Sequence, residues 1–521
     1  MALTKVTNSL LDSGALVSKA FATDSIMIGD DVTGTISGAN NNTGLGVDVF
    51  EALTTGQSNV AIGLDSLTAL TTGNYNTGVG RLTLSSVTTN SNNTAVGGVA
   101  LQNNTGSDNT AIGSSALTAN TSASNNTAVG SSALLSNTVG GSNVALGYQA
   151  MNSNVQGDRA VAVGYQALYT QNPSTSGEDT FNTAVGFSSM ALTTTGINNT
   201  AVGAKALESN TTGNENVAVG ANALDANTTG NYNIGIGKDA LGSHTTGTYN
   251  VAVGKLSQQS ITTGNSNVAV GYNTLGSNVA GDRNTAVGQQ TLQSMSSATT
   301  ADTYNTGFGH AAGLNVTTGT GNTLIGGLAG DLITTGEYNT VLGYDGGSNI
   351  TTGVNNTLIG RNTKISASSA ANTIVINADT AFATGKGSNT GFINPNSGGV
   401  YQGNNSSSWS TTSDRRIKKN IEDNNTGLNE IKQIQVRNFE YRTRDEIEEL
   451  SPDCEVKKEG VQLGVIAQEI QEILPDVVKE EDTGCLRVDP DNITWYLVNA
   501  VKELSAKCDS LQNEINTLKG E

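Results

Sequence analysis

Cysteine, proline, aromatic residues and charged residues are all scarce in this chain. Its 521 residues include 3 Cys and 5 Pro, and only 4% are aromatic and 14% charged. Average soluble domains carry about 25% charged residues, so the composition argues against a conventional enzyme with one thick core. It argues equally against simple disorder, because disordered chains are typically rich in charge and proline.

Basic patches and long apolar runs are also lacking. The formal net charge is −19 at pH 7, whereas nucleic-acid binding needs clustered Lys and Arg to neutralise phosphates. No run of about 18 apolar residues could span a membrane, and residues 1–21 hold no continuous apolar segment typical of a signal peptide. We therefore expect a chain made in a cytosol, with no nucleic-acid partner and no membrane insertion.

The three cysteines lie close to the C-terminal end, at Cys454, Cys485 and Cys508, and none belongs to a CxxC motif. Three cysteines do not make a disulfide framework, and zinc sites usually need paired cysteines. We therefore expect three reduced, buried thiols, with no metal site and no cofactor.

Glycine, by contrast, is abundant and periodic. The chain has 63 Gly, and most of the recurring ones are 17 residues apart, within the consensus N-x-A-V-G-x-x-A-L-x-x-x-T-T-G. The repeating glycines are Gly29, Gly46, Gly63, Gly80, Gly97, Gly113, Gly130, Gly147, Gly164, Gly186, Gly203, Gly220, Gly237, Gly254, Gly271, Gly288, Gly309, Gly326, Gly343 and Gly360. Two longer steps leave room for loops over Asn172–Asp179 and Met295–Asp302. Internal repeats of this kind indicate a stacked architecture.

A period of 17 residues is typical of one coil of a parallel β-solenoid, or β-roll. The N-x-A-V-G piece is read as a short strand, and its Gly supplies a corner with positive φ. Stacked Asn side chains should form a hydrogen-bonded ladder. With coils about 4.8 Å apart, residues 25–380 would form about 20 coils and a rod roughly 95 Å long.

The apolar content of each coil is small. We expect one Val or Ile and one Leu to be buried per coil, at roughly 1.5–3 kcal/mol for each side chain. Ordering the backbone costs about 1–2 kcal/mol per residue. We therefore expect an obligate homotrimer, whose intertwined chains bury the Val and Leu stripes around a common axis.

Several coils match a known adhesin repeat. Asn59–Gly63 reads N-V-A-I-G, Asn143–Gly147 reads N-V-A-L-G and Asn216–Gly220 reads N-V-A-V-G. These units resemble the heads of trimeric autotransporter adhesins (YadA-like heads), which form a left-handed parallel β-roll. The coils here are longer than is typical for those adhesins.

No catalytic cluster is evident in the repeat, where His244 and His310 lie in different coils and the acidic residues are scattered. A glycosidase needs two carboxyls close together, which distant coils could supply across a trimer, so a polysaccharide depolymerase is one alternative. The other is a non-viral ice- or surface-binding adhesin, whose Thr ladders, such as Thr71–Thr72 and Thr211–Thr212, order water.

From Ser413 the chain becomes richer in charge. Ser413–Ile421 reads S-D-R-R-I-K-K-N-I, and Val461–Pro475 reads V-Q-L-G-V-I-A-Q-E-I-Q-E-I-L-P, a strand followed by a helix that ends before Pro475. A heptad stripe then consists of Leu497, Val501, Leu504, Cys508, Leu511, Ile515 and Leu518. It predicts a coiled coil over about 497–518, and the alternative is a helix packed on its own domain.

Together these three pieces resemble the peptidase S74 domain, the intramolecular chaperone of phage tail fibres and tail spikes. The resemblance implies trimerisation of the preceding fibre and a single-turnover self-cleavage between Thr412 and Ser413. Ser413 matches the nucleophile and Lys418 the base of a Ser-Lys dyad, and Asp414 and Arg416 match positioning residues. A serine hydroxyl is a weak nucleophile until a base takes its proton, and a tethered peptide bond needs no substrate pocket.

These observations predict a mainly β chain that ends in a small α/β domain. Residues 1–24 would attach to the virion, 25–380 form the solenoid shaft or head, 381–412 a linker, and 413–521 the chaperone with its coiled coil. The resemblance implies a homotrimeric fibre or spike that is synthesised in the host cytoplasm and located in the virion. Its expected partners are a tail or baseplate component and a host surface receptor, with a glycan as one candidate.

Overall fold

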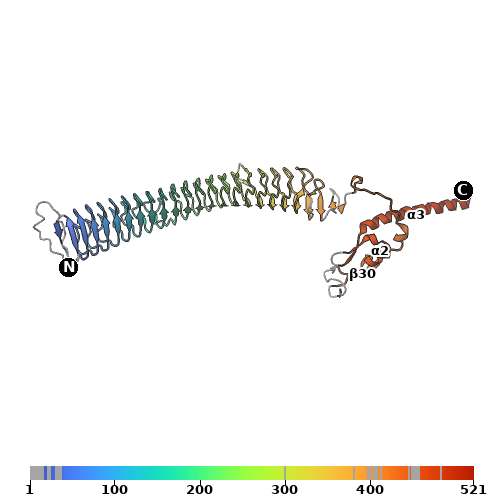
Figure 1. Ribbon diagram of the computed structural model, residues 1–521, viewed down its shortest axis with the longest axis horizontal. Helices are drawn as coiled ribbons and strands as arrows, with labels where there is room; N and C mark the ends of the chain where they lie inside the picture. The colour runs from blue at the N-terminus through green and yellow to red at the C-terminus, as the bar shows by residue number, and fades with distance from the viewer. Residues whose placement is uncertain are drawn as a thin grey trace. The chain divides into compact units, whose positions relative to one another are not determined.

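The protein forms two compact units, Met1–Thr412 and Ser413–Glu521. The computed structural model describes residues 17–19, 25–29, 38–297, 301–378, 382–395, 400–402, 409–410, 413–443, 446–447, 458–480 and 484–520. Figure 1 shows the first unit as a long stack of coils, coloured from blue to orange, and the helices of the second unit in red.

The first unit is built on one 25-stranded sheet. Its parallel strands are β2 (Ile26–Gly29), β3 (Thr43–Gly46), β4 (Val60–Ile62), β5 (Thr77–Val79), β6 (Thr94–Val96), β7 (Thr110–Ile112), β8 (Thr127–Val129), β9 (Val144–Leu146), β10 (Val161–Val163), β11 (Thr183–Val185), β12 (Thr200–Val202), β13 (Val217–Val219), β14 (Ile234–Ile236), β15 (Val251–Val253), β16 (Val268–Val270), β18 (Thr285–Val287), β20 (Thr306–Phe308), β21 (Thr323–Ile325), β22 (Thr340–Leu342), β23 (Thr357–Ile359), β25 (Ile374–Asn377) and β27 (Gly391–Asn394).

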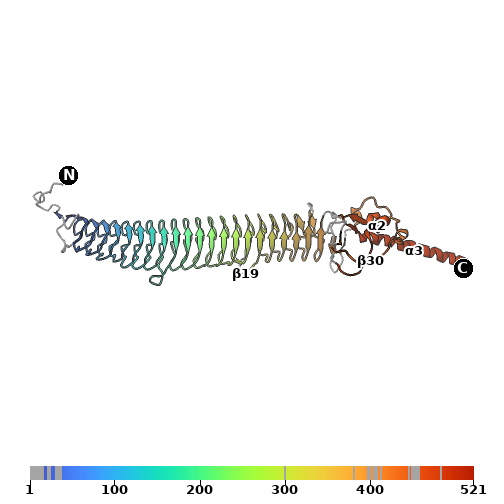
Figure 2. The ribbon, with the colours of Figure 1, turned by 90° about the horizontal axis from the view of Figure 1, so that it is seen from below.

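Each strand pairs in parallel with the strand one coil later. Val217 of β13 lies opposite Ile234 of β14, for example, and Ala218 lies opposite Gly235. Equivalent repeat positions therefore stack along the unit, as the regular rows of arrows in Figure 2 show. The predicted parallel β-solenoid with a 17-residue repeat is confirmed.

The regular spacing of Asn along the repeat produces the predicted interior ladder. Asn216 Oδ1 accepts hydrogen bonds from the backbone N–H of Asn233 (3.0 Å) and from its Nδ2 (3.1 Å). Asn216 Nδ2 donates to the carbonyl of Gly230, at 2.8 Å. These Asn residues are fully buried, so the ladder satisfies backbone groups that would otherwise be costly to bury.

The glycine that follows each strand allows two coils to approach closely. Gly220 has φ +132, and a Cβ there would lie 2.7 Å from the carbonyl carbon and oxygen of Gly237. Both the positive φ and the close backbone exclude a side chain. The predicted glycine corner is therefore present, and glycine is required both by the positive φ and by the close approach of the next coil.

Other corners use residues that carry side chains. Asn222 (φ 55) and Leu224 (φ 53) are both left-handed, and the same two positions repeat in coil after coil. Left-handed backbone costs a non-glycine residue roughly 1–2 kcal/mol. Backbone hydrogen bonds to the neighbouring coils, such as those from Asn222 to Ala204 and from Leu224 to Ala240, offset this cost. The consensus sequence alone did not predict these left-handed corners.

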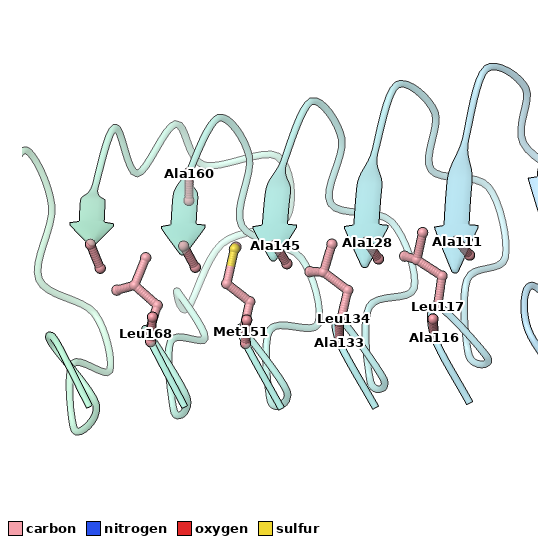
Figure 3. Packing of buried hydrophobic residues seen from close by; sticks show 14 of the residues in the cluster. Ala111, Ala116, Leu117, Ala128, Ala133, Leu134, Ala145, Met151, Ala160 and Leu168 are labelled. Carbon is pink, nitrogen blue, oxygen red and sulfur yellow. The ribbon is translucent and has the colours of Figure 1, made fainter. Parts of the chain in front are cut away.

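The core of most coils consists of Ala and Leu. Ala111, Ala128 and Ala145 lie on the strands, and Leu117 and Leu134 point toward them from the opposite wall (Figure 3). All five side chains are fully buried. Leu is buried as expected, but the expected burial of the Val or Ile before each glycine is wrong. Side chains alternate along the short strand, so its middle residue, usually Ala, points inward and the Val or Ile points outward.

Threonine side chains also join successive coils. Thr71 Oγ1 donates to the carbonyl of Thr88 at 3.1 Å, and Thr211 Oγ1 donates to that of Thr228 at 2.9 Å. These hydroxyl protons are engaged by the protein backbone. The first Thr of each pair therefore does not present its donor to water, as the ice-binding alternative would require.

In each of the two longer coils, an Arg–Asp ion pair holds the extra residues and the strand register is kept. Arg159 pairs with Asp179, and Arg283 pairs with Asp302. Short strands β17 (Gly281–Asp282) and β19 (Ala301–Asp302) pair in parallel beside the second ion pair. The extra residues are thus anchored locally, and the main sheet continues without interruption.

Antiparallel strands flank the parallel stack at both ends. β1 (Val17–Lys19) pairs with β2, while β28 (Val400–Gln402) pairs with β27 and with β29 (Trp409–Ser410). Strands β24 (Thr363–Lys364) and β26 (Ala383–Thr384) pair beside the last coils. The predicted linker over 381–412 thus contains strands of the solenoid, whereas most of the predicted segment 1–24 lies outside the described residues.

The second unit contains small sheets and helices. Its elements are the 3-10 helix η2 (Arg415–Ile417), α1 (Leu428–Ile431), β30 (Arg437–Phe439), β31 (Gln462–Gly464), α2 (Ala467–Ile473), the 3-10 helix η5 (Pro475–Val477), β32 (Val478–Glu480), β33 (Leu486–Val488) and α3 (Pro490–Lys519). Strands β30 and β31 pair antiparallel, as do β32 and β33. A small core forms around Ile470, Leu474 and Val477.

The cysteines and the terminal helix differ from a simple packed domain. Cys485 is disulfide-bonded and Cys508 is exposed, so the expectation of three reduced, buried thiols is wrong.

Tyr496 and Ala500 are the buried residues of α3. Across the described ranges, no helix combines the length and apolarity needed to span a bilayer.

Candidate active site at the start of the second unit

Ser413 and Lys418 lie together at the first residues of the second unit. The single turn η2 separates them, and its N-cap, Asp414, accepts a hydrogen bond from the backbone N–H of Arg416 at 2.8 Å. This turn brings Lys418 back toward Ser413, and Lys418 Nζ donates to Ser413 Oγ at 2.7 Å. The two residues that were predicted as nucleophile and base are therefore in hydrogen-bond contact.

Asp414 and Arg416 form an ion pair beside this contact. Arg416 Nη2 lies 2.5 Å from Asp414 Oδ2, and Arg416 Nε lies 3.1 Å from both carboxylate oxygens. These hydrogen bonds lower the pKa of Asp414 below its ordinary value and raise the pKa of Arg416. The pair fixes the turn that carries Lys418, which suits the positioning role predicted for both residues.

The site is open to solvent in the single chain. Ser413 and Lys418 are both exposed, as are Arg415 and Lys419. Thr412, the predicted residue on the other side of the scissile bond, lies outside the described residues. The contact between the dyad residues is thus present in one chain, and the described residues of that chain leave both side chains open to water.

The segment after the dyad is tied to α3. Asn499 Nδ2 donates to the carbonyls of Asn424 (2.8 Å) and Thr426 (3.1 Å), and the Glu503 carboxylate accepts from the backbone N–H of Leu428 at 3.2 Å. Asn499 and Glu503 were not singled out in the sequence. Their spacing of four along a helix gave the only signal.

Tyr496 secures the same end of α3. Its hydroxyl donates to Asp476 at 2.5 Å. This hydrogen bond, helped by burial, raises the pKa of Tyr496 above its ordinary value. A groove of about 860 Å³ runs beside these residues, between Glu422–Asn425 and α3, with Trp495 and Lys502 on its wall. The contacts explain how the helix holds the segment that follows the dyad.

One protein-family comparison matches this part of the chain. Residues 413–479 match the family described as Peptidase_S74, chaperone of endosialidase. The chain carries a chaperone-of-endosialidase domain. The matched range begins at Ser413, the first residue of the second unit.

The chaperone-of-endosialidase match covers η2, β30, β31 and α2 but ends at Lys479. Helix α3, whose heptad stripe is the third part of the resemblance, lies beyond it. The combination of this domain with a long parallel β-solenoid fits a protein of the tail-spike or tail-fibre type. Over the described part of the chain, no group of three His, Cys, Asp or Glu residues is arranged to hold a metal ion.

Proposed function

We propose that this protein is a homotrimeric phage tail fibre or tail spike that is folded by its C-terminal chaperone domain and then cleaved between Thr412 and Ser413. The observation that carries this proposal is the 2.7 Å contact between Lys418 Nζ and Ser413 Oγ at the first residue of the domain. The solenoid would form the shaft or head that meets a host surface receptor. The N-terminal segment would join the particle.

The proposed cleavage is a one-step transfer followed by hydrolysis. Ser413 Oγ attacks the carbonyl carbon of Thr412, and Lys418 Nζ takes the hydroxyl proton and passes it to the departing amide nitrogen of Ser413. The Thr412–Ser413 peptide bond breaks as an ester forms on Ser413 Oγ, and water then hydrolyses that ester. Effective molarities are high for such tethered groups, which suits a single turnover.

Lysine can act as this base only in its neutral form, and desolvation favours the neutral form of an amine. Both dyad residues are exposed in the single chain. We therefore expect association of three chains to bury the dyad, so that assembly precedes cleavage. Because Asn499 and Glu503 of α3 hold the segment after the dyad, packing of α3 would be communicated to the site.

The apolar stripe on α3 supports the trimer. Val501 is 65% exposed, Leu511 57% and Leu518 87%, although all lie at heptad positions of a 30-residue helix. A heptad stripe of this kind is buried by neighbouring helices in a coiled coil. Three copies of α3 would remove these side chains from water and bring the three chains into the same register.

The test is to express the full chain beside Ser413→Ala and Lys418→Met and to measure intact masses under denaturing conditions. Wild type should yield two fragments that meet at Thr412–Ser413, and both variants should stay whole. Arg415→Met, at an exposed neighbour outside the hydrogen-bonded pair, serves as the matched control and should still be cleaved. Cleavage of Ser413→Ala at the same bond would contradict the dyad.

A further inference from the structure

The outward side of the β-sheet is a largely apolar surface, uncharged in its central strand positions, that runs along the solenoid. We define the sheet face by the strands of the 25-stranded sheet from β3 to β23. It consists of the first and third residues of each of these strands, together with the residues two positions before and two positions after the strand. In the strands themselves these positions hold only Thr, Val, Ile, Leu or Phe. Their middle residues point inward and are buried.

Apolar exposure in the solenoid concentrates on this sheet face. Phe308 is 56% exposed and Leu342 46% at the third strand position, where Val would have been expected in the core. The exposed large apolar residues of the face include Leu45, Leu64, Tyr75, Ile112, Tyr148, Tyr165, Phe181, Phe187, Val202, Val219, Tyr232, Ile236, Tyr249, Val270, Tyr272, Tyr304, Phe308, Ile325, Tyr338, Leu342, Tyr344 and Ile359. Among the described residues 38–378, those elsewhere that are equally exposed include Val139, Leu192, Val279 and Leu332.

Aromatic side chains form the margins of the sheet face. Tyr148 stacks on Tyr165, with ring centroids 5.4 Å apart, and Tyr165 stacks on Phe187 at 5.1 Å. On the other margin Tyr232 stacks on Tyr249 at 4.9 Å. Rings around an aliphatic centre are the composition that protein interfaces favour, while Lys, Glu and Asp are depleted there.

Acidic residues are almost excluded from the sheet face. Between β3 and β23 the charged residues at its positions all lie at the margins, and they are Asp48, Asp108, Glu215, Arg81, Arg159, Lys238, Lys255, Arg283 and Arg361. The other carboxylates of these coils, such as Asp225, Asp239 and Asp331, lie at positions outside it. The acidic excess of a chain of net charge −19 therefore lies largely outside this face, and the uncharged centre of the face offers little electrostatic opposition to close approach.

The area is sufficient for stable association. The nineteen strands of this face, spaced about 4.8 Å apart and each three residues wide at about 3.3 Å per residue, present roughly 900 Å² per chain. A standard specific interface buries about 800 Å² per partner. Large apolar surfaces of this kind are rare on soluble monomers.

From these observations we infer that the sheet face is the surface through which copies of this chain pack along the length of the solenoid. The inference rests on the proposed trimer but not on the Ser413–Lys418 dyad. It also explains the outward Val and Ile side chains, which take no part in the core formed by the buried Ala and Leu. The opposite, Thr-rich wall and the acidic corners would then face solvent and any receptor.

Cysteine labelling and cross-linking test this surface in the full chain. In a Cys508→Ser background, Val219→Cys places a thiol in the centre of the sheet face, and Thr229→Cys places one at an exposed position on the Thr-rich wall. With a short bis-maleimide, Val219→Cys should give covalently linked chains on a denaturing gel. Thr229→Cys should give none. A mono-maleimide should label Val219→Cys at least tenfold more slowly than Thr229→Cys in the native protein and equally fast after unfolding.

Sedimentation equilibrium of the same samples separates the two proposals. If the chain is trimeric, but Val219→Cys labels as fast as Thr229→Cys and forms no cross-link, the sheet face is not the packing surface although the trimer stands. If the folded chain is monomeric, the trimer and the packing surface both fail. Slow labelling with sedimentation as a trimer supports the inference even where the thiols are too far apart to be linked.

Discussion

The two units of this chain bury their apolar side chains in different ways. In the solenoid, Ala and Leu of each coil are enclosed by the same chain, and the Asn ladder satisfies the polar groups around them. In the second unit, the core around Ile470 and Val477 is small, and most of the heptad residues of α3 are exposed. The solenoid coil is locally complete, whereas the heptad side chains of the terminal helix stay exposed in the single chain.

This difference bears on how the protein assembles. Coils of one length and nearly one sequence offer similar contacts in registers that differ by a whole coil, so side-by-side packing of solenoids is weakly specified. A separate unit that associates first through α3 would set one register before the solenoids pack. On the proposed assembly, the second unit would therefore specify the register that the repeating coils leave open.

The largest effect is expected where the solenoid admits no side chain. Gly220→Val would place Cβ 2.7 Å from the backbone of Gly237 at a φ of +132. We expect a loss of about 5 kcal/mol, at the upper end of single substitutions, because the strain and the collision add. Native-state hydrogen exchange over residues 200–255 should show the neighbouring coils opening. Gly98→Ala, where an added Cβ meets nothing within 4 Å, is the control, and equal protection in both variants would refute the steric account.

The Asn ladder should come next. Asn216→Ala would leave the backbone N–H of Asn233 without its acceptor, whereas the carbonyl of Gly230 would keep the bond from Asn227 Nδ2, at 3.1 Å. One unsatisfied buried group costs about 1–3 kcal/mol, and the lost bond to Gly230 adds to this, so local opening should become easier by about 3 kcal/mol. Thr229→Ala, on the exposed wall, should change little. The same exchange measurement checks both, and a neutral Asn216→Ala would mean that the coil core alone maintains the stack.

His244 adds an acid sensitivity to the ladder. Its neutral ring fits between Asn227 Oδ1 (3.0 Å from Nδ1) and Asn250 Nδ2 (3.3 Å from Nε2). Burial lowers its pKa to about 4. The folded coil thus binds this proton less readily than the unfolded chain, and its contribution is full above pH 6.5 and is lost as the pH falls toward 4.

His244→Asn, which copies the residue found at the same position in earlier coils, should therefore remove about 3 kcal/mol of acid destabilisation. Melting curves between pH 7 and pH 3.5 measure it. His310→Asn, at an exposed histidine, should leave the pH dependence of wild type intact. If His244→Asn melts with the same pH profile as wild type, the buried ring does not titrate with folding.

The smallest effect is expected at Asp331. Burial and the neighbouring Asp345 raise its pKa above the ordinary value, and its Oδ1 has no hydrogen-bond partner. The ionised form therefore opposes folding at neutral pH, and this effect fades as the pH falls below the raised pKa. Asp331→Asn should stabilise the solenoid at pH 7 by less than about 1 kcal/mol, whereas Glu215→Gln, at an exposed carboxylate, should not. Destabilisation by Asp331→Asn in melting curves would contradict this.

Much of the solenoid was predictable because each coil repeats its chemistry. The period, the glycine corner and the Asn ladder follow from Asn and Gly recurring at fixed spacing, as in Asn216 and Gly220. The direction of Val219 was predicted wrongly, since size suggested burial while a three-residue strand turns only Ala218 inward. The left-handed Asn222 and Leu224 were missed because Leu does not signal positive φ, and because Asn, which tolerates it, is frequent at many other positions of the repeat.

The candidate site was predictable in identity but not in environment. The S-D-R-R-I-K spacing pointed to Ser413 and Lys418, and one 3-10 turn explains how five positions bring them together. Their exposure depends on packing that a motif does not encode. The ties from Asn499 and Glu503 to the segment after the dyad join residues some 75 positions apart, which no local pattern reveals.

The central claim is that the second unit is required for the solenoids to assemble correctly. Its most direct test is to produce residues 1–412 without Ser413–Glu521, beside full-length Ser413→Ala, and to examine the soluble fractions by sedimentation equilibrium. The account predicts that Ser413→Ala is a soluble trimer and that residues 1–412 aggregate or associate in mixed registers. Soluble, uniform trimers of residues 1–412 would show that the solenoid aligns itself, and they would contradict the chaperone role.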